Sequence, residues 1–564
     1  MTPTQDSSPR SAGRILVDQL LIHGATCGYC VPGESYLEVL DALHDVSDRF
    51  TLINARHEAG AANMAEAHGK LTGAPGIAFV TRGPGACHAA IGVHIARQDS
   101  TPMILLVGQV GRDMMDREAF QEIDYRAMFG SVAKWAAQID DAARIPEYMA
   151  RAFRVATSGR PGPVVLALPE DMLAEERTVA DSPPYRPALP ELGEDGAARI
   201  GTLLHGAERP LLIVGGGGWS DAASADITRF AELAGLPAIC SFRRQDIIGA
   251  ESGSYAGDLG TASDPALTAR IAEADLLLVV GARLGEMTTK GYSAISAPTP
   301  AQKIIHLHPD ADELGRVYAP ALGCVAAPGP AAARLARLAG ESWPAGRWRD
   351  RWRVWRRALR DAWLADTAAP AREAHALDLS MVMDAFRQIL PKDAIITLDA
   401  GNHGGWAQRF LRYGRPGRQL GSTCGAMGYS VPAGVAASIA EPGRVVLSFV
   451  GDGGFMMSGA EIATAAQHGG RPIVVVINNA SYGTIRMHQE KAHPGRVVGT
   501  DLVNPDFVAM ARAMGAHAER VETTAQAGPA LRRAIACGAP AVIELVVEAE
   551  QISSRTTLSR LRGG

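Results

Sequence analysis

Residues 444–479 read RVVLSFVGDGGFMMSGAEIATAAQHGGRPIVVVINN, and this stretch decides the fold. The runs at 444–450 and 471–477 are short, apolar and rich in β-branched residues, as in buried strands of a parallel sheet. Residues 459–468 between them are predicted to form a helix. A right-handed βαβ unit of this kind brings both strand ends to one edge of the sheet. We therefore predict an α/β fold with a ligand site at that edge.

Polar side chains follow both predicted strands. Asp452 comes directly after the first strand, and Asn479 comes directly after the second. A carboxylate and an amide oxygen suit Mg²⁺, whose octahedral site is often completed by phosphate oxygens. The neighbouring glycines, which allow the backbone to approach a phosphate closely, are Gly451, Gly453 and Gly454. The alternative is an ordinary turn with a helix cap, but the pair of motifs favours a metal and diphosphate site.

The two motifs together resemble a known signature. Gly451-Asp452-Gly453, followed by Asn478-Asn479, is similar to the metal and diphosphate motif of the thiamine diphosphate (ThDP) enzymes. The resemblance implies ThDP and Mg²⁺ as cofactors, with Ser481 as a third metal ligand beside Asp452 and Asn479. It also implies three doubly wound parallel-sheet domains: a pyrimidine-binding domain, a central domain and a diphosphate-binding domain.

Length and strand patterns agree with this organisation. At 564 residues the chain is too long for a single core, and three α/β blocks can be recognised in it. The predicted division is a flexible N-terminal tail at 1–14, a pyrimidine-binding domain at 15–180, a central domain at 191–340, a linker helix at 341–378, a diphosphate-binding domain at 379–550 and a C-terminal tail at 551–564.

Composition restricts the class of protein. Apolar residues make up 47% of the chain, charged residues 20%, and the net charge is −5, which argues against disorder and against a nucleic-acid partner. The longest apolar stretches are strand-sized, and the first residues lack the apolar core of a signal peptide. Seven cysteines in a long chain suggest a reducing compartment. We expect a cytoplasmic enzyme without a membrane partner.

The second chemical motif is Arg56-His57-Glu58-Ala59-Gly60, between the strand TLIN and a helix. Partial burial of Glu58 would raise its pKa and keep the carboxyl protonated near neutrality. ThDP requires such a group, because a hydrogen bond to pyrimidine N1′ lets the amino group remove the thiazolium proton. Taken alone, Glu58 is better explained as a helix-start carboxylate. The resemblance implies that it is the catalytic residue.

Further cofactor contacts are implied only by the resemblance. The turn that contains Pro84 corresponds to the loop beside the pyrimidine, and Asn402 and His403 correspond to a diphosphate contact. In the segment GSTCGAMG, the Gly425 carbonyl would accept from the amino group and Met427 would bend the cofactor. A buried methionine without this context is more often core filler.

Within the family the chain resembles the acetolactate synthase large subunits. The run Gly108-Gln109-Val110, followed by Ala119-Phe120-Gln121-Glu122, is similar to their substrate loop. The chain departs from them in having Glu34 and Ser35 after Pro32-Gly33, and His488 where they have tryptophan. The predicted substrate-side residues are Gly33, Ser35, Arg82, Phe120, Gln121 and His488.

The resemblance implies that the enzyme decarboxylates a 2-oxoacid and ligates the resulting enamine to a second carbonyl. Simple decarboxylation, an acyl-transferring lyase reaction and a catalytically silent ThDP-binding protein are the alternatives. The family pattern also implies a homodimer or homotetramer, because the glutamate of one subunit faces the diphosphate domain of another.

Three other features receive structural explanations. Cys27 and Cys30 have C-x-x-C spacing without a second pair, so a buried strand is favoured over a metal site. The run Gly215–Gly218 lacks GxGxxG order, and the sequence leaves open whether the central domain binds FAD. Five of the eight tryptophans fall within 343–363 among many arginines, as expected for a helix packed between domains.

Overall fold

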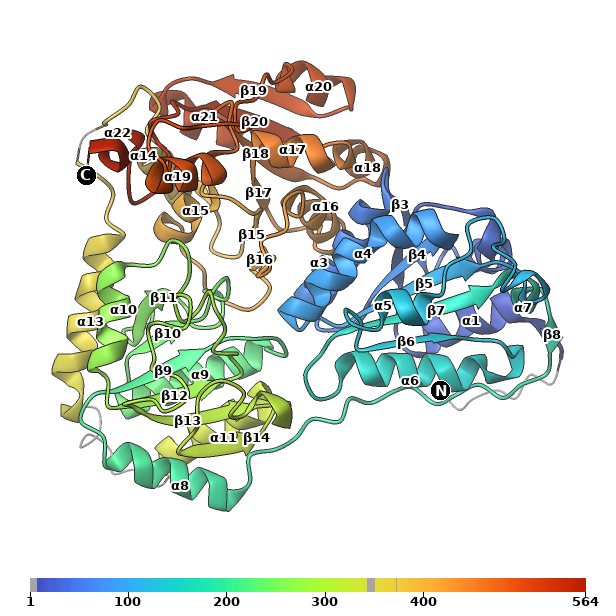
Figure 1. The fold of residues 1–564 in the computed structure, drawn as a ribbon, viewed down its shortest axis with the longest axis horizontal. Coiled ribbons are helices and arrows are strands. Elements are labelled where there is room, and N and C mark those ends of the chain that lie inside the picture. The colour runs from blue at the N-terminus through green and yellow to red at the C-terminus, as the bar shows by residue number, and fades with distance from the viewer. Residues whose placement is uncertain (1–7, 342–349, 372, 564) are drawn as a thin grey trace. The chain divides into compact units, whose positions relative to one another are not determined.

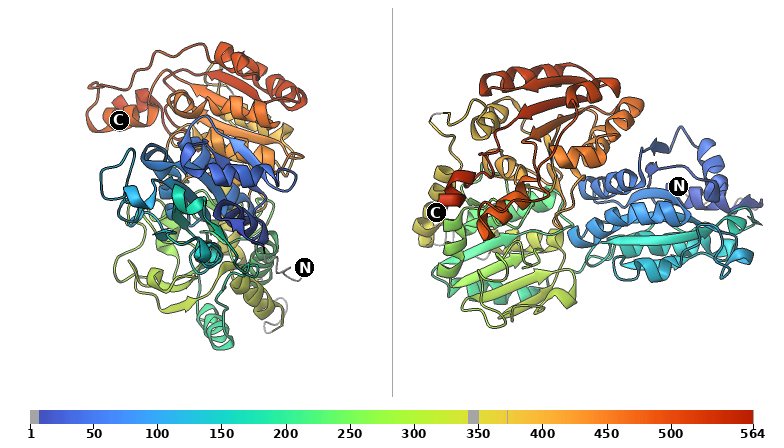
Figure 2. Two further views of the ribbon diagram at one scale, coloured as in Figure 1. Left: turned by 90° about the vertical axis from the view of Figure 1, so that its right-hand side faces the viewer. Right: turned by 45° about the horizontal axis from the view of Figure 1, so that its top comes forward.

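The computed structural model describes residues 8–341, 350–371 and 373–563. The chain forms two compact units, each described here by itself. The first contains residues up to 188 together with 435–441 and 458–470, and the second contains the remainder. Three six-stranded parallel sheets form the framework, each with helices packed on its faces (Figures 1 and 2). The predicted fold of three doubly wound α/β domains is confirmed.

The first unit is built on a sheet in the order β3-β2-β4-β5-β7-β6. Its strands are β2 (Cys27–Cys30), β3 (Thr51–Asn54), β4 (Gly76–Thr81), β5 (Met103–Gln109), β6 (Trp135–Gln138) and β7 (Pro163–Pro169). Its helices are α1 (Ala12–Ile22), α2 (Leu37–His44), α3 (Glu58–Thr72), α4 (Arg82–Asp99), α5 (Tyr125–Phe129), α6 (Ile145–Thr157), α7 (Glu170–Leu173) and α18 (Glu461–His468). The short strands β1 (Arg10–Ser11) and β8 (Glu176–Arg177) pair antiparallel.

The second unit contains two sheets. The central sheet has the order β11-β10-β9-β12-β13-β14, the doubly wound order in which the chain reverses direction beside the first strand. Its strands are β9 (Pro210–Val214), β10 (Ala238–Cys240), β11 (Tyr255–Asp258), β12 (Leu276–Val280), β13 (Lys303–His308) and β14 (Leu322–Val325). Its helices are α8 (Glu194–His205), α9 (Asp221–Ala234), α10 (Pro265–Glu273), α11 (Pro328–Glu341) and α13 (Arg353–Asp366).

The C-terminal sheet has the order β16-β15-β17-β18-β20-β19. Its strands are β15 (Ile395–Leu398), β16 (Gln419–Gly421), β17 (Val446–Gly451), β18 (Pro472–Asn478), β19 (His517–Val521) and β20 (Ala541–Val546). Its helices are α14 (Leu379–Ile389), α15 (Gly404–Phe410), α16 (Ser430–Ala440), α17 (Asp452–Ser458), α19 (Gly483–Ala492), α20 (Phe507–Ala513), α21 (Thr524–Ala536) and α22 (Leu558–Gly563). In order of appearance along the chain, its strands are arranged as in the first sheet.

Burial explains why these segments form strands. Every residue of β5, β7 and β9 is buried, because helices cover both faces of each parallel sheet. The predicted strand TLIN is β3, and the predicted strands at 444–450 and 471–477 correspond to β17 and β18, with differences of one or two residues at their ends. One short helix, α17, was not predicted as a separate element; it begins at Asp452 and precedes α18.

The segments outside the predicted domains contain more structure than expected. Residues 1–7 of the predicted N-terminal tail lie outside the described residues, but α1 begins at Ala12 because the Ser11 hydroxyl caps it. The predicted C-terminal tail contains α22, whose Arg562 pairs with Glu490. Helix α13 lies within the predicted linker, of which 342–349 and 372 are not described.

The tryptophans of the linker pack as the sequence predicts. The indole N–H of Trp352 donates to the Ala207 carbonyl at 3.1 Å, and that of Trp355 donates to Pro210 at 3.0 Å. Trp363 packs edge-on against Tyr255, while the guanidinium of Arg360 stacks on its ring. Trp343 and Trp348 lie outside the described residues.

Among the described residues, no helix is both long and apolar enough to cross a membrane.

Candidate active site

The ends of β17 and β18 border a cavity in the second unit. Gly451 and Ile477 are register partners in the two strands, so the chain segments that follow them leave the sheet side by side. A cavity that is open to solvent lies at this edge. Its lining includes the cofactor-side residues predicted for this domain: Asn402, His403, Gly425, Met427, Gly451, Asp452, Gly453, Gly454, Asn479 and Ser481.

Asp452 is almost fully buried and ties the two strand ends together. Its Oδ1 accepts from its neighbour Gly453 N at 2.9 Å, and its Oδ2 accepts from Ser481 N at 3.2 Å. Oδ2 also accepts from the amide of Asn504 at 2.9 Å. Burial raises the pKa of Asp452, while these hydrogen bonds favour the carboxylate. The side chain is therefore held in one orientation at the floor of the cavity.

The hydroxyl of Ser481 fits the predicted metal site. Ser481 is 4% exposed, and its Oγ is buried without a hydrogen-bond partner among the described residues. A buried polar atom without a partner is costly unless a ligand or water satisfies it. Asn479 Oδ1 lies close to Ser481, because it accepts a hydrogen bond from Ser481 N at 3.2 Å. Carboxylate, amide and hydroxyl oxygens form a donor set that suits Mg²⁺.

His403 also presents an unpartnered atom to the cavity. Its Nε2 is buried and has no hydrogen-bond partner among the described residues. Burial and the charge of Arg243 lower the pKa of His403 to about 3, so the ring is neutral. Asn402 is fixed beside it, because its backbone N–H donates to Thr484 Oγ1 at 2.9 Å and its amide donates to Ile552 O at 2.9 Å.

Gly453 of the GDG motif lines the cavity and also packs closely against another residue of the protein. A Cβ atom on Gly453 would lie 2.4 Å from the ring of Tyr482. Close packing on Tyr482 therefore explains this glycine independently of any phosphate.

A buried acid that sequence reasoning missed, Asp399, organises the loop that carries Met427. It follows β15 and is inaccessible to solvent. Its carboxylate accepts backbone hydrogen bonds from Ala400 at 2.7 Å, Gly428 at 3.0 Å and Ser430 at 3.2 Å. Burial raises the pKa of Asp399 to about 6. Met427 lies in this loop and is 37% exposed at the cavity.

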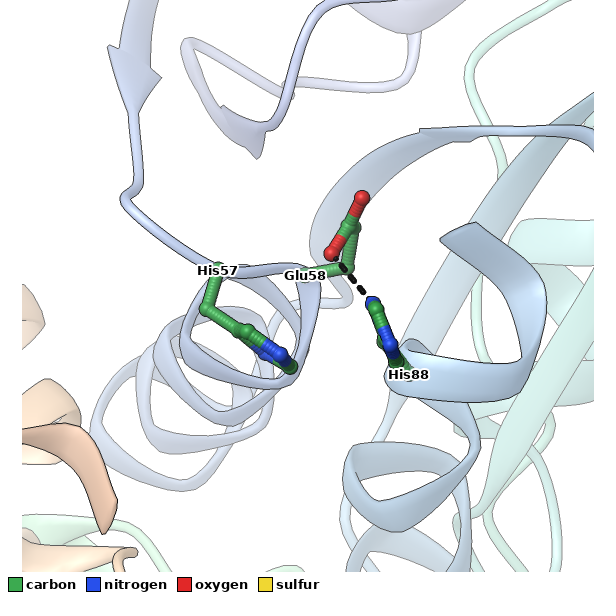
Figure 3. Close-up of side chains that lie close together, drawn as sticks. All are labelled: His57, Glu58 and His88. Carbon is green, nitrogen blue, oxygen red and sulfur yellow. Dashed lines mark hydrogen bonds and ion pairs between the residues drawn. The ribbon is translucent and has the colours of Figure 1, made fainter. Parts of the chain in front are cut away.

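The predicted catalytic acid lies in the first unit. Glu58 is the first residue of α3, and the side chain of His57 caps this helix by accepting from Ala59 N at 3.1 Å. The Glu58 side chain is 15% exposed, and its Oε2 lies 2.8 Å from Nδ1 of His88 on α4 (Figure 3). The acid is thus partly buried, as the sequence predicts, with one oxygen bound and the other pointing away from His88.

A second buried acid that the sequence did not reveal, Glu461, holds the strand end before Glu58. Its carboxylate accepts from Arg56 N at 3.1 Å and from His57 N at 3.2 Å. It lies so close to α3 that a Cβ atom on Gly60 would be 2.1 Å from its Oε1. Burial raises the pKa of Glu461, and Thr464 donates a further hydrogen bond to it.

The substrate-side residues predicted in the first unit gather near the start of α4. The Ser35 hydroxyl, two residues after Gly33, is 2.6 Å from the hydroxyl of Thr81. Gly83 N, next to Pro84, donates to Gln121 O at 2.9 Å. Phe120 is 74% exposed.

The other two predicted substrate residues, Arg82 and His488, have different surroundings in the structure. Arg82, which was predicted to lie on the substrate side, pairs with Glu170 at 2.7 Å and is mostly buried. Its charge is therefore largely neutralised within the protein. In the second unit, His488 is exposed on α19 one turn after Ile485, which is also exposed and lines the cavity together with Thr484.

The secondary motifs have structural roles. Cys27 and Cys30 lie in β2, and neither forms a disulfide. In the glycine-rich loop, Gly215 O accepts from the indole of Trp219 at 2.8 Å, and Gly216 O accepts from Arg244. These contacts fix the loop with the chain's own side chains.

Comparison with known proteins identifies each domain. Three family models match, described as the N-terminal TPP binding domain, the central domain and the C-terminal TPP binding domain of thiamine pyrophosphate enzymes, at residues 10–128, 197–335 and 399–545. Thiamine pyrophosphate is another name for ThDP. The chain is also similar to "Acetolactate synthase large subunit" of Parasynechococcus marenigrum, with 31% identity over 90% of this chain and 82% of the relative.

Two further relatives have similar coverage. "Acetolactate synthase" of Mycobacterium bovis is 30% identical over 92% of this chain and 85% of its own length. "Acetolactate synthase isozyme 2 large subunit" of Escherichia coli is 30% identical over 94% of this chain and 95% of its own length.

The hydrogen bonds of Asp399 predict a stability effect. Asp399→Asn replaces one acceptor oxygen by an amide N–H₂ that faces backbone N–H donors, so it should lower the free energy of unfolding by about 2–4 kcal/mol. Thermal unfolding of the variant measures this, with Asp393→Asn as the control, because Asp393 is exposed just before the same strand. An unchanged midpoint in Asp399→Asn would contradict the proposed role of the carboxylate.

Proposed function

Because this chain belongs to the thiamine pyrophosphate enzymes, and within them resembles the acetolactate synthase large subunits, we propose that it decarboxylates a 2-oxoacid and ligates the product to a second carbonyl. The proposal is carried by two features of the chain: a partly buried acid at the start of α3 in the first unit, and a cavity in the second unit that contains buried polar atoms without partners among the described residues. The acid is suited to activating the cofactor, and the cavity is suited to binding the diphosphate of the cofactor.

The residues of the second unit would bind and orient the cofactor. Asp452, Asn479 and Ser481 would hold Mg²⁺, and the neutral His403 would contact the diphosphate. Met427, on the loop that Asp399 fixes, would supply an apolar surface for the bend of the cofactor. When bound, ThDP supplies the nucleophilic carbon and the electron sink that decarboxylation of a 2-oxoacid requires.

In the first unit, the protein's own contribution is to hold and move a proton at Glu58. Its carboxyl would exchange a hydrogen bond with the pyrimidine nitrogen of the cofactor. Arg56 and His57, held by Glu461, fix the backbone that leads into α3, so Glu58 needs little reorganisation.

The remaining features of the enzyme are proposals that rest on the resemblance. We infer a homodimer or homotetramer in which Glu58 of one copy serves the diphosphate domain of another. The cysteines are free, which agrees with a reducing compartment such as the cytoplasm.

The metal site predicts that ThDP binding depends on Asp452 and on Mg²⁺. Asp452→Ala removes the buried carboxylate, so ThDP affinity should fall by more than about 100-fold, and removal of Mg²⁺ from the wild type should have a similar effect. Isothermal titration calorimetry of ThDP with and without Mg²⁺ measures both. Asp361→Ala, at an exposed acid on α13, is the matched control. Unchanged affinity in Asp452→Ala would contradict the assignment.

His488 predicts the choice of acceptor. An imidazole favours a polar partner, whereas the tryptophan of the resembled family favours a small aliphatic 2-oxoacid. We expect weak acetolactate formation from pyruvate and an increase in kcat/KM of about tenfold in His488→Trp. Steady-state assays of both proteins with pyruvate alone test this. Efficient acetolactate formation by the wild type, with no increase in kcat/KM in His488→Trp, would show that His488 does not face the acceptor.

A further inference from the structure

A histidine that the proposed function does not use is hydrogen-bonded to its catalytic acid. His88 lies on α4, and its Nδ1 is 2.8 Å from Oε2 of Glu58 on α3 (Figure 3). The His88 side chain is 51% exposed, whereas that of Glu58 is only 15% exposed. The imidazole therefore connects a partly buried carboxyl to water.

The surrounding groups hold this pair in place. Helices α3 and α4 pack closely, since a Cβ atom on Gly92 of α4 would lie 2.5 Å from the Cβ of Ala62 on α3. The ring of His57 lies 4.4 Å from that of His88, between centroids. The relative position of the two side chains is thus determined by packed helices and not by a mobile loop.

A divalent metal is a less satisfactory explanation of the same cluster. His57, Glu58 and His88 place one potential ligand atom each within 4.8 Å of one another, as a metal site requires. However, Nδ1 of His57 accepts the capping hydrogen bond from Ala59 N, which leaves the proton of a neutral ring on Nε2. A metal at either nitrogen would cost α3 this cap or require an unfavourable tautomer. The geometry favours proton exchange between Glu58 and His88.

We propose that His88 is a positioning residue that orients the carboxyl of Glu58 and relays protons between it and solvent. The inference rests on the proposed function, because it assumes that Glu58 serves the cofactor. In the tautomer that we assign to His88, Nδ1–H donates to Oε2, while Oε1 points away from His88 and is left to face the cofactor (Figure 3).

The proton transfer balances within the pair. A proton from hydronium or a buffer acid binds Nε2 of His88, which makes the ring cationic and leaves water or the conjugate base. The Nδ1 proton then passes to Oε2 of Glu58, which leaves a neutral carboxyl and a neutral imidazole protonated at Nε2. The reverse sequence returns a proton to water. No oxidant, reductant or further reactant is needed.

The proton relay can be tested without substrate by measuring the exchange of the thiazolium C2 proton of ThDP with deuterium. In protein loaded with ThDP and Mg²⁺, His88→Ala should slow the exchange by about 10- to 100-fold, and added imidazole should restore much of the rate. His88→Asn retains an N–H donor but cannot relay a proton, so it should also be slow and should not respond to imidazole. A purely structural role for His88 would not give this difference between the two variants.

A second readout uses the cofactor-free protein. In nuclear magnetic resonance spectra of ¹⁵N-histidine-labelled protein, the ring-nitrogen resonances of His88 are assigned as those that disappear in His88→Asn. Glu58→Gln should shift these resonances. His94→Asn, six residues further along α4, is the matched control for both experiments and should leave exchange unchanged. Calorimetry with ThDP verifies that each variant still binds the cofactor.

The outcomes separate this inference from the proposed function. Slow exchange in Glu58→Gln with wild-type exchange in both His88 variants would overturn the role of His88 and leave that of Glu58 intact. Wild-type exchange in Glu58→Gln, with ThDP bound, would overturn the proposed function itself. Slow exchange in His88→Ala that imidazole does not restore would overturn the relay.

Discussion

Buried carboxylates that accept hydrogen bonds from backbone N–H groups hold the loops of both candidate sites. Asp452 binds Gly453 and Ser481, Asp399 binds Ala400, Gly428 and Ser430, and Glu461 binds Arg56 and His57. Such charge-assisted bonds are stronger than those between neutral groups, and burial makes loss of a partner expensive. The irregular backbone at the strand ends therefore has a defined conformation, on which the positions of the functional side chains depend.

Some polar side chains of the two candidate sites support the backbone, and others are available to bind ligands or transfer protons. The oxygens of Asp399 and Glu461 are engaged in hydrogen bonds within the protein, so these two acids are poor candidates for chemistry, whereas Asp452 also lines the cavity. Glu58 and Ser481 retain unoccupied atoms: Glu58 has one oxygen directed away from His88, and the Ser481 hydroxyl is buried without a partner among the described residues. Sites of this kind, in which rigid elements present a few unsatisfied groups, are suited to binding and proton transfer without large rearrangement.

Much of the fold follows from sequence pattern, but the supporting acids do not. Apolar β-branched runs predicted the parallel strands, and the rule for strand ends placed Asp452 near Asn479. Asp399 and Glu461 escaped notice because their partners are backbone N–H groups, which have no residue signature, and most lie far away in sequence. Glu170, which neutralises Arg82, escaped for a related reason: it is 88 residues away and belongs to no motif.

The reaction proposed for this protein is the removal of carbon dioxide from a 2-oxoacid with ThDP as the cofactor. Its most direct test is the release of labelled carbon dioxide from a panel of 2-oxoacids labelled with ¹³C at the carboxyl carbon. We predict release from at least one of them that requires both ThDP and Mg²⁺ and is largely lost in Glu58→Gln. No release from any 2-oxoacid by protein shown to contain bound ThDP would contradict the account.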